Sequence, residues 1–247
     1  MSPESLDDVR AHAHVEKAVF ALRPDYRALV IAVAGLIPGP GDAASEAALR
    51  AAEGTAYGLV AGTPVEEVPQ VASWREAYRA FGAKPQRTRN SLEALLRRAA
   101  DGLPRVNRLT DCYNAVSVKH RIPIGGEDLS RYVGAPRLIR ATGEESFDTV
   151  AQGATTVEHP EPGEVVWADD AGVTCRRWNW RQARRTALTE ETTEALFILD
   201  ALDPVTDDDL HAAGEELLVL LRGRGPQLAV ARRLLRAADE PEAALPV

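Results

Sequence analysis

Residues 74–128 read WREAYRAFGAKPQRTRNSLEALLRRAADGLPRVNRLTDCYNAVSVKHRIPIGGED. This stretch combines two amphipathic helical patterns, a group of arginines between and after them, and a polar segment that leads into an apolar run. The first pattern is an apolar stripe from Trp74 to Phe81 at the spacing of one helical face. Ser73 with Glu76 has the spacing of a capping box, so we expect a helix to begin at Ser73.

The second helical pattern follows Asn90. Its apolar stripe runs from Leu92 to Ala99, and Asn90 with Glu93 again has the spacing of a capping box. The pattern favours Asn90 as a helix cap over a ligand contact. The connecting loop, Gly82–Arg89, carries Lys84, Arg87 and Arg89, and we interpret these three cations as candidates for RNA binding.

The end of the stretch is interpreted as irregular and extended structure. Thr110–Asn114 is expected to form a polar turn, Ala115–Lys119 a strand, and Ile122–Gly126 an irregular loop.

The rest of the chain mixes helical and extended patterns. Tyr26–Leu36 is nearly continuous in apolar residues, which predicts a strand buried on both faces. The other expected strands are Val15–Leu22, Tyr57–Gly62, Arg137–Ala141 and a hairpin over Glu164–Trp180, and the other expected helices are Asp42–Glu53, two helices that begin at Thr189 and Thr206, and Gln227–Ala238.

These elements neither alternate regularly nor separate along the chain. We therefore predict an α+β fold with a mixed, mostly antiparallel sheet flanked by helices. A single domain is expected over residues 1–240, followed by a disordered Pro/Glu-rich tail at 241–247.

Composition restricts the class of protein. Hydrophobic residues make up 45% of the 247 residues, which is enough for a substantial core. No apolar run is long enough to span a membrane, and the polar N-terminus does not have the pattern of a secretory signal. We expect a cytoplasmic protein with no membrane partner, and reduced thiols at Cys112 and Cys175.

Charge is unevenly distributed along the chain. The net charge is −8, yet cations dominate from Lys84 to Arg108 and again from Arg176 to Arg185. A protein that is acidic overall can still present a local positive face to phosphates. The alternative is a set of ordinary solvated faces.

Catalytic chemistry has weak signals in this sequence. His12 and His14 are close together, but no zinc-binding motif occurs, and we expect no metal and no cofactor. Cys112 precedes His120 by eight residues, although a buried structural thiol explains Cys112 better than a nucleophile does. The catalytic group stays unknown.

The segment Trp178-Asn179-Trp180-Arg181 is more distinctive. In a strand, Trp178 and Trp180 would share one face and could form a platform for a base or an apolar side chain. A pair of core tryptophans explains the pattern equally well. Arg184 and Arg185, just before the expected helix at Thr189, could hold a phosphate together with that helix's amides.

Several motifs resemble, in order and spacing, the B3/B4 module, the editing region of the phenylalanyl-tRNA synthetase beta subunit, in its free-standing form. Asp111-Cys112-Tyr113-Asn114 resembles the family's Val-Asp-Val-Thr-Asn segment, and Ile122–Leu129 resembles its Gly-Gln-Pro-Met-His-Ala-Phe-Asp loop. Further similarities lie at Gly143–Phe147, Glu164–Asp170 and Thr189–Thr192. The resemblance covers roughly Trp74 to Leu202.

The resemblance implies hydrolysis of the ester between a wrong amino acid and its tRNA, with tRNA as the partner. It implies a substrate pocket made from Tyr113, Asn114, Gly125, Gly126, Trp178, Asn179, Trp180 and Arg181. On the same interpretation, the acceptor end is bound by Lys84, Arg87, Arg89, Arg184 and Arg185.

Two departures from the family pattern affect specificity. The family's loop histidine falls on Gly125, and its Gly-x-x-Gly-Gly-Glu segment, which helps to recognise a tyrosine hydroxyl, is replaced by Trp178–Arg184. We therefore expect an acyl group other than tyrosine. A non-catalytic tRNA-binding module and an enzyme acting on a free amino acid or small ester are the alternatives. The oligomeric state is open.

Overall fold

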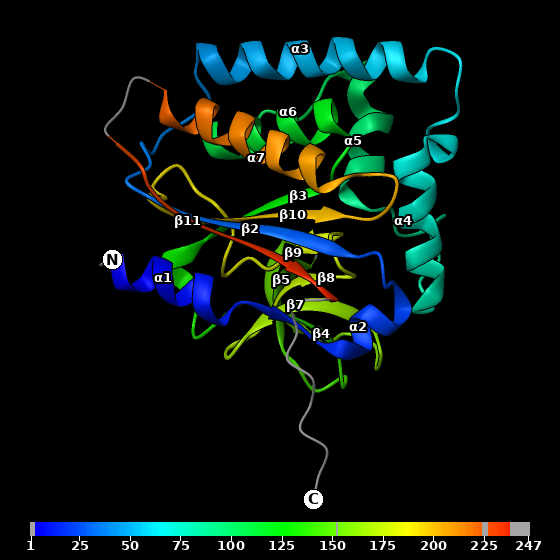
Figure 1. The fold of residues 1–247 in the computed structure, drawn as a ribbon, viewed down its shortest axis with the longest axis vertical. Coiled ribbons are helices and arrows are strands. Elements are labelled where there is room, and N and C mark those ends of the chain that lie inside the picture. Colours follow the sequence, from blue (N-terminus) through cyan, green and yellow to red (C-terminus); the bar gives the residue numbers. More distant parts are fainter. Residues whose placement is uncertain (1–2, 152, 224–226, 238–247) are drawn as a thin grey trace, which may run out of the picture.

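The computed structural model describes residues 3–151, 153–223 and 227–237. Two β-sheets and a layer of helices are stacked on one another (Figure 1). The four-stranded sheet is antiparallel and has the order β11 (Ala229–Arg236), β2 (Arg27–Ala34), β10 (Glu194–Ala201) and β3 (Ile124–Asp128).

The second sheet has five strands. Its order is β1 (His14–Val15), β4 (Arg137–Arg140), β7 (Val165–Asp169), β8 (Gly172–Arg176) and β9 (Arg181–Gln182). The pair β1–β4 is parallel, and the other neighbours are antiparallel. A separate hairpin is formed by β5 (Phe147–Ala151) and β6 (Ala154–Glu158). The predicted α+β fold with a mixed, mostly antiparallel sheet is confirmed.

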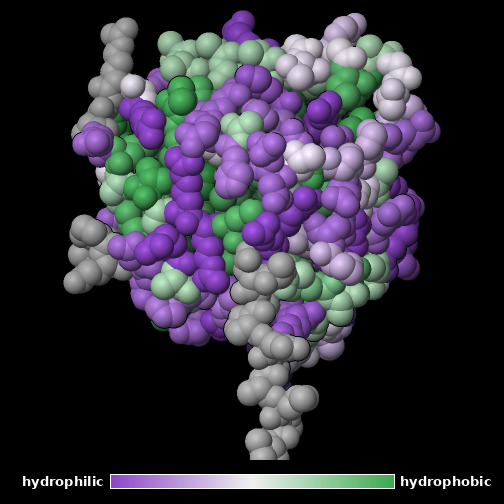
Figure 2. Space-filling view, viewed as in Figure 1, coloured by the Kyte–Doolittle hydropathy of each residue, from purple (hydrophilic) through white to green (hydrophobic). Residues whose placement is uncertain are grey.

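Helices cover the outer face of the four-stranded sheet and its sides (Figure 1). Three lie over that face, namely α3 (Ala43–Val60), α6 (Arg108–His120) and α7 (Asp207–Arg222). The others are α1 (Pro3–His12), α2 (Lys17–Leu22), α4 (Pro69–Ala80) and α5 (Ser91–Arg98), with short 3-10 turns η1 (Val65–Glu67), η2 (Ala99–Asp101) and η3 (Leu129–Arg131). Hydrophilic residues cover most of the face seen in this view, with apolar patches near its left and upper edges (Figure 2).

The hydrophobic core has layers on both sides of β2. Leu29 and Ile31 pack with α6 and α7, whereas Val30 and Ala32 pack with residues of the second sheet. Alternate residues of a strand point to opposite faces, so β2 is buried on both, as its apolar run predicts.

The largest error of the sequence interpretation concerns α6. Residues 110–119 were expected to form a turn and a strand, but Arg108–His120 is one helix capped by Asn107, whose side chain accepts a hydrogen bond from the Thr110 amide. Most residues of α6 are buried. Burial between α3, α7 and β3 overrides the strand preference of its β-branched residues.

Several other expected elements also differ. Val15–Leu22 divides into β1 and α2, Tyr57–Val60 continues α3, and Ile124–Asp128 is a strand rather than a loop. The expected helices after Thr189 and over Gln227–Ala238 are the strands β10 and β11. The apolar residues of these two strands pack on both faces of the four-stranded sheet. A short apolar run in the sequence does not distinguish such a buried strand from a helix.

The capping box expected at Ser73 is absent, because α4 begins at Pro69 and Ser73 lies within the helix, where its hydroxyl accepts a hydrogen bond from Arg23. The predicted caps at Asn90 and Thr206 are confirmed. The predicted tail at 241–247 lies outside the described residues.

Candidate functional site

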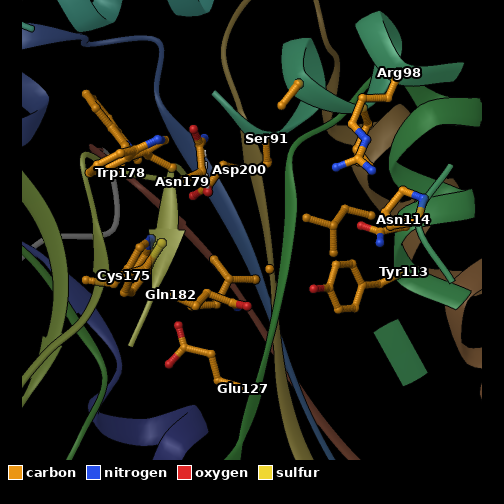
Figure 3. A pocket seen from close by; sticks show the side chains of 18 residues that line it. Ser91, Arg98, Tyr113, Asn114, Glu127, Cys175, Trp178, Asn179, Gln182 and Asp200 are labelled. Carbon is orange, nitrogen blue, oxygen red and sulfur yellow. Dashed lines mark hydrogen bonds between the residues drawn. The ribbon is translucent and has the colours of Figure 1, made fainter. Parts of the chain in front are cut away.

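A cavity of about 240 Å³ lies between the two sheets, below α5 and α6. Figure 3 shows side chains from both sides of the molecule converging on it. The lining residues come from α5, α6, both sheets and the turn after β8: Ser91, Ala94, Leu95, Arg98, Pro104, Tyr113, Asn114, Ile124, Gly125, Glu127, Trp167, Cys175, Trp178, Asn179, Trp180, Gln182, Ile198 and Asp200.

Helix α5 gives one face to the cavity. Ser91, Ala94, Leu95 and Arg98 recur at the spacing of a single helical face. The helix starts at Asn90, whose side chain accepts a hydrogen bond from the Glu93 amide at 2.9 Å. Arg98, in its last turn, is exposed and makes no hydrogen bond or ion pair with any other described residue. Its guanidinium group lies above Asn114 (Figure 3).

Two paired strands, β3 and β10, supply buried carboxyl groups. Gly125 is opposite Ile198, and Glu127 is opposite Leu196. Residues opposite each other in an antiparallel pair point to the same face. Because Asp200 is two residues beyond Ile198, its side chain also points toward the second sheet, as does that of Glu127. The strand register therefore brings both acids to the cavity.

Glu127 is 1% exposed. Its Oε2 accepts a hydrogen bond from the Tyr132 hydroxyl at 2.6 Å, and the hydroxyl groups of Thr174 and Thr186 also hydrogen-bond to the carboxyl group. Burial raises the pKa of Glu127 to about 7. The carboxyl group is therefore poised to change charge near neutral pH.

Asp200 is 2% exposed and lies among neutral donors. Its Oδ1 accepts from the Tyr26 hydroxyl at 2.6 Å, and its Oδ2 accepts a longer bond of 3.4 Å from the Asn179 amide. Burial raises the pKa of Asp200 to about 7 as well.

The turn after β8 holds Asn179 against the cavity. Arg177 and Trp178 both have positive φ, of 49° and 69°, so the chain reverses here instead of continuing as a strand. Asn179 accepts a hydrogen bond from Tyr78 through its side chain and from the amide of Ser91 through its carbonyl oxygen. The start of α5 is thereby attached to this turn.

The predicted two-indole platform is wrong, because Trp178 and Trp180 are not on one face of a strand. Trp178 is fully buried and packs edge-on against Tyr26 and Trp74 at centroid distances of 5.0 and 5.4 Å. The Trp180 ring instead lies beside guanidinium groups, with that of Arg177 at 4.6 Å. Both indoles line the cavity without forming a stack.

Gly125 and Gly126 each have a packing reason. A Cβ atom on Gly125 would lie 3.2 Å from Nε2 of Gln182, and one on Gly126 would lie 2.9 Å from the ring of Tyr113. The Gln182 amide donates a 2.9 Å hydrogen bond to the carbonyl oxygen of Gly126. Gln182 therefore occupies the space that a side chain at position 125 would enter.

The predicted pocket residues are largely brought together. Tyr113, Asn114, Gly125, Trp178, Asn179 and Trp180 line the cavity. The side chain of Asn114 is buried and makes no hydrogen bond with another described residue, which leaves its amide for a ligand. Two predicted residues do not line it: Gly126 supports Tyr113 and Gln182, and Arg181 pairs with Glu158 at 2.6 Å.

The predicted RNA-binding cations form two groups. Lys84, Arg87 and Arg89 are exposed in the loop before α5, and this loop contacts the turn after β8 through a hydrogen bond from Arg177 to Thr88. Arg184 and Arg185 instead border a separate hollow of about 590 Å³.

Those two arginines also hold acids. Arg184 pairs with Asp148 at 3.2 Å, and Arg185 donates two hydrogen bonds to Asp169, at 2.8 and 2.9 Å. The predicted phosphate contact with the amides of a helix at Thr189 has no basis, because no helix forms there.

The cysteines are both buried and free, as predicted. Burial raises the pKa of Cys112 to about 11, so its thiol is not an activated nucleophile. Within the described residues, no group of three histidine, cysteine or acidic side chains could hold a metal ion. No helix in the same ranges has the length and apolar character to cross a membrane.

The B3/4 domain family model matches residues 73–216, more than half of the chain. The chain belongs to the B3/4 domain family. The predicted resemblance is confirmed, and the matched range contains every residue that lines the cavity. Membership of the B3/4 family gives the protein a role related to tRNA binding and editing. No curated protein matches the sequence.

Sequence reasoning missed five polar residues of this B3/4 cavity: Ser91, Arg98, Glu127, Gln182 and Asp200. Glu127 stands where the family's loop carries phenylalanine, in the pairing that places the loop histidine on Gly125. A charged residue at a position that is apolar in the family was the sequence signal that could have identified Glu127 as a cavity residue. Asp200 ends an apolar run that was interpreted as a helix, and only the strand register shows where it points.

Proposed function

We propose that this B3/4 domain protein is a free-standing aminoacyl-tRNA deacylase that hydrolyses the ester of a mischarged tRNA in trans. The observation that carries the proposal is the cavity below α5, which contains two buried carboxyl groups and the unbonded amide of Asn114. A partly open cavity with apolar walls and a few polar groups, within the family-matched region, suits recognition of an acyl group.

The acceptor end of the tRNA would lie at the rim of the cavity. Arg98 lies at the exposed end of α5 with a guanidinium group that no acid neutralises among the described residues. Lys84 and Arg87 extend the positive charge along the preceding loop, and Arg89 is half exposed although it lies 3.8 Å from Glu93. Such cations bind phosphates by electrostatic attraction and counterion release. Because Arg184 and Arg185 hold acids at another hollow, support for their contact with RNA is weaker.

The reaction on this proposal is direct hydrolysis. The oxygen of a water molecule bonds to the acyl carbonyl carbon and gives up a proton, the bond between that carbon and the ribose oxygen breaks, and the ribose oxygen receives a proton to become a hydroxyl group. Asn114 and Gln182 offer amide groups that could orient the ester or stabilise the negative oxygen of the intermediate. No covalent enzyme intermediate is needed.

The specificity is proposed to differ from that for tyrosine. A side chain is missing at Gly125, and the turn containing Trp178 and Asn179 replaces the family's glycine-rich acidic segment. A site that lacks a buried hydrogen-bonding partner for a substrate hydroxyl group selects poorly for substrates that carry this hydroxyl.

The experiment is a deacylation panel. Each of the proteinogenic amino acids is attached to tRNA in radiolabelled form, and its release is measured with and without the protein. We expect one chemical class of acyl group to be released well above the buffer rate. Arg98→Ala should raise KM more than it lowers kcat, because Arg98 is assigned to binding. No release above buffer for any member would refute the deacylase.

The second candidate is a non-catalytic tRNA-binding module, and Gly125 in place of the loop histidine favours it. The same panel separates the two. Binding to tRNA that weakens with salt and on Arg98→Ala, without release of any acyl group, would establish the binding module.

A further inference from the structure

We propose that the cavity selects an acyl group whose side chain ends in a cation, held by Glu127 and Asp200 on the cavity floor. The inference names the substrate class for the proposed deacylase and rests on that function only for the link to tRNA. The ligand chemistry is an ammonium or guanidinium group on an aliphatic stem.

The first support is the missing positive partner of these two acids. Three of the five other buried acids among the described residues each have an arginine: Glu93 is paired with Arg75 at 2.7 Å, Glu164 with Arg176 at 2.8 Å, and Asp169 with Arg185 at 2.8 Å. The other two, Asp111 and Asp128, accept hydrogen bonds from backbone amides and do not line the cavity. Glu127 and Asp200 form no ion pair within the described residues and contact only neutral donors. Buried carboxylates are normally paired or neutralised.

The second support is that the hydrogen bonds to these two acids come only from neutral groups. An ionised carboxyl group has about four lone-pair sites. Glu127 accepts from the hydroxyl groups of Tyr132, Thr174 and Thr186. Asp200 accepts a short bond from Tyr26, a longer one of 3.4 Å from Asn179, and a further one from Trp167. An ammonium or guanidinium group of a ligand would supply the charged donor that both acids lack.

The electrostatic state of the floor agrees with this geometry. Burial raises the pKa of Glu127 and of Asp200 to about 7, which is the expected result for carboxyl groups without a cation. An incoming ammonium group would favour the ionised form and supply the kind of pairing found at Glu93, Glu164 and Asp169.

The third support is the composition of the walls. Tyr113, Ile124 and Ile198 line the cavity together with Trp167 and Trp178. Long basic side chains pack their methylene stems on apolar and aromatic surfaces while the charged end reaches a polar group. Indole rings near a cation add an attraction through their π faces.

The arrangement of charge also gives the ligand a direction. Acids lie at the buried end of the cavity, and Arg98 lies at its exposed end. A molecule with a cation at one end and a phosphate at the other matches this polarity. A lysyl or arginyl group esterified to the terminal nucleotide of tRNA has this distribution, whereas an acidic acyl group would meet like charge at the floor.

The test uses two esters of nearly equal shape. L-Lysine methyl ester and L-norleucine methyl ester share the α-amino group and the ester, and they differ in the terminal ammonium group. Isothermal titration calorimetry at pH 8 should show that the lysine ester binds at least tenfold more tightly. Equal affinities, or tighter binding of norleucine, would overturn the inference.

Variants locate the effect. Glu127→Gln keeps the shape and the acceptor for Tyr132 and should reduce the lysine preference to less than threefold, as should Asp200→Asn. Glu161→Gln, at an exposed acid outside the cavity, should leave the preference unchanged. The ratio of two affinities measured on the same sample does not depend on the folded fraction of a destabilised variant. A lysine preference that persists in both cavity variants would contradict the inference.

Failure of the inference can be told apart from failure of the proposed function. If the deacylation panel shows release of apolar acyl groups only, the deacylase stands and the cation site is wrong. If the lysine ester binds selectively and no charged tRNA is hydrolysed, the cation site stands and the deacylase is wrong.

Discussion

Gln182 and Gly125 share one small volume at the edge of the cavity. The amide of Gln182 donates to the carbonyl oxygen of Gly126, and a Cβ atom at position 125 would lie 3.2 Å from that amide nitrogen. The two positions, which are far apart in the sequence, are therefore coupled by packing. A side chain at one requires a smaller side chain at the other.

A double-mutant cycle tests this coupling. Gly125→His alone should lower the free energy of unfolding by about 1–3 kcal/mol through overpacking, and part of the loss should be recovered when Gln182→Gly is added. Denaturant unfolding of the four proteins gives the coupling energy. Gly126→Ala is the control, because its Cβ atom would meet Tyr113 and Leu188 instead, so Gln182→Gly should not rescue it.

Glu127 has further neighbours that decide its titration. Burial raises the pKa of Glu127 most, the hydrogen bonds from Tyr132, Thr174 and Thr186 lower it, and the charge of Asp169 raises it slightly. The charge of Glu127 in turn raises the pKa values of Asp200 and Cys175. Of these acids, Asp169 is neutralised by Arg185. Removing the charge of Glu127 should therefore relieve several unfavourable interactions together.

The stability of the protein should show this as a pH dependence. The pKa of Glu127 is raised from its ordinary 4.5 to about 7, so the folded protein holds a proton that the unfolded chain loses between these values. The resulting stabilisation is present below about pH 4.5 and is lost as the pH rises through 7. The change in unfolding free energy caused by Glu127→Gln should be more stabilising at pH 8 than at pH 5, by up to about 3 kcal/mol. Urea unfolding at both pH values measures it, and the same difference from wild type at each would contradict the assignment.

At the scale of elements, helix α5 connects the fold to the site. One stripe, including Leu92 and Leu96, packs in the helical layer, and the adjacent face lines the cavity. The helix begins at the cap residue Asn90. This cap was predictable from the sequence, because capping depends on residues that are close together in the chain. Its attachment to Asn179 was not predictable, since it joins segments far apart in the chain.

Removal of this cap should lower the stability of the protein. Asn90→Ala should cost about 1 kcal/mol of unfolding free energy, because the Glu93 amide loses its acceptor at a buried helix start. Asn90→Ser should keep most of the stability, as serine is also a good cap. Thermal unfolding of both variants provides the comparison, and equal losses would argue against a capping role.

Strand and helix assignments failed where burial on all sides hides the periodicity. The run Ala195–Leu199 was interpreted as part of a helix and is the centre of β10, between β2 and β3. Conversely, Ala115–Lys119 was interpreted as a strand and lies within α6. Short apolar runs fit either element, and the contacts that decide between them come from the rest of the fold. The prediction of the site failed for the same reason, because the direction of the Asp200 side chain can be inferred only once β10 is recognised as a strand.

The two neighbouring arginines after β9 should differ sharply in their effects. Arg185→Ala should destabilise the protein by about 3 kcal/mol, because it leaves the fully buried carboxylate of Asp169 without its bidentate partner. Arg184→Ala removes a pair with Asp148 that is half exposed on the arginine side, and should cost less than about 1 kcal/mol. Denaturant unfolding distinguishes them. Similar losses for the two would contradict a structural role specific to Arg185.

At the scale of the whole molecule, the net charge of −8 conceals a local positive surface. Arg98 lines the cavity on α5, and Lys84 and Arg87 lie in the loop before that helix, whereas other cations such as Arg105 are neutralised by acids. Total charge thus predicts repulsion from RNA, and its distribution predicts attraction.

Binding to tRNA should consequently be sensitive to salt. The logarithm of the affinity should fall linearly with the logarithm of the salt concentration, with a slope of roughly 0.7–0.9 for each phosphate neutralised. Replacing Lys84, Arg87 and Arg98 together by alanine should reduce the slope by about 2 to 3. Filter binding at several salt concentrations measures it. The control is Arg105→Ala, which should weaken binding little, and an unchanged slope in the triple variant would place the RNA elsewhere.

The antiparallel pairing of β2 with β10 and β11 has a consequence for expression of shortened forms. The family-matched range, 73–216, contains β3 and β10 but lacks β2 and β11. A fragment cut at those limits would lose the strand that separates the two core layers and the Tyr26 hydroxyl that binds Asp200. We expect such a fragment to aggregate through the exposed edge of β10, so the limits of family similarity are not those of an autonomous folding unit.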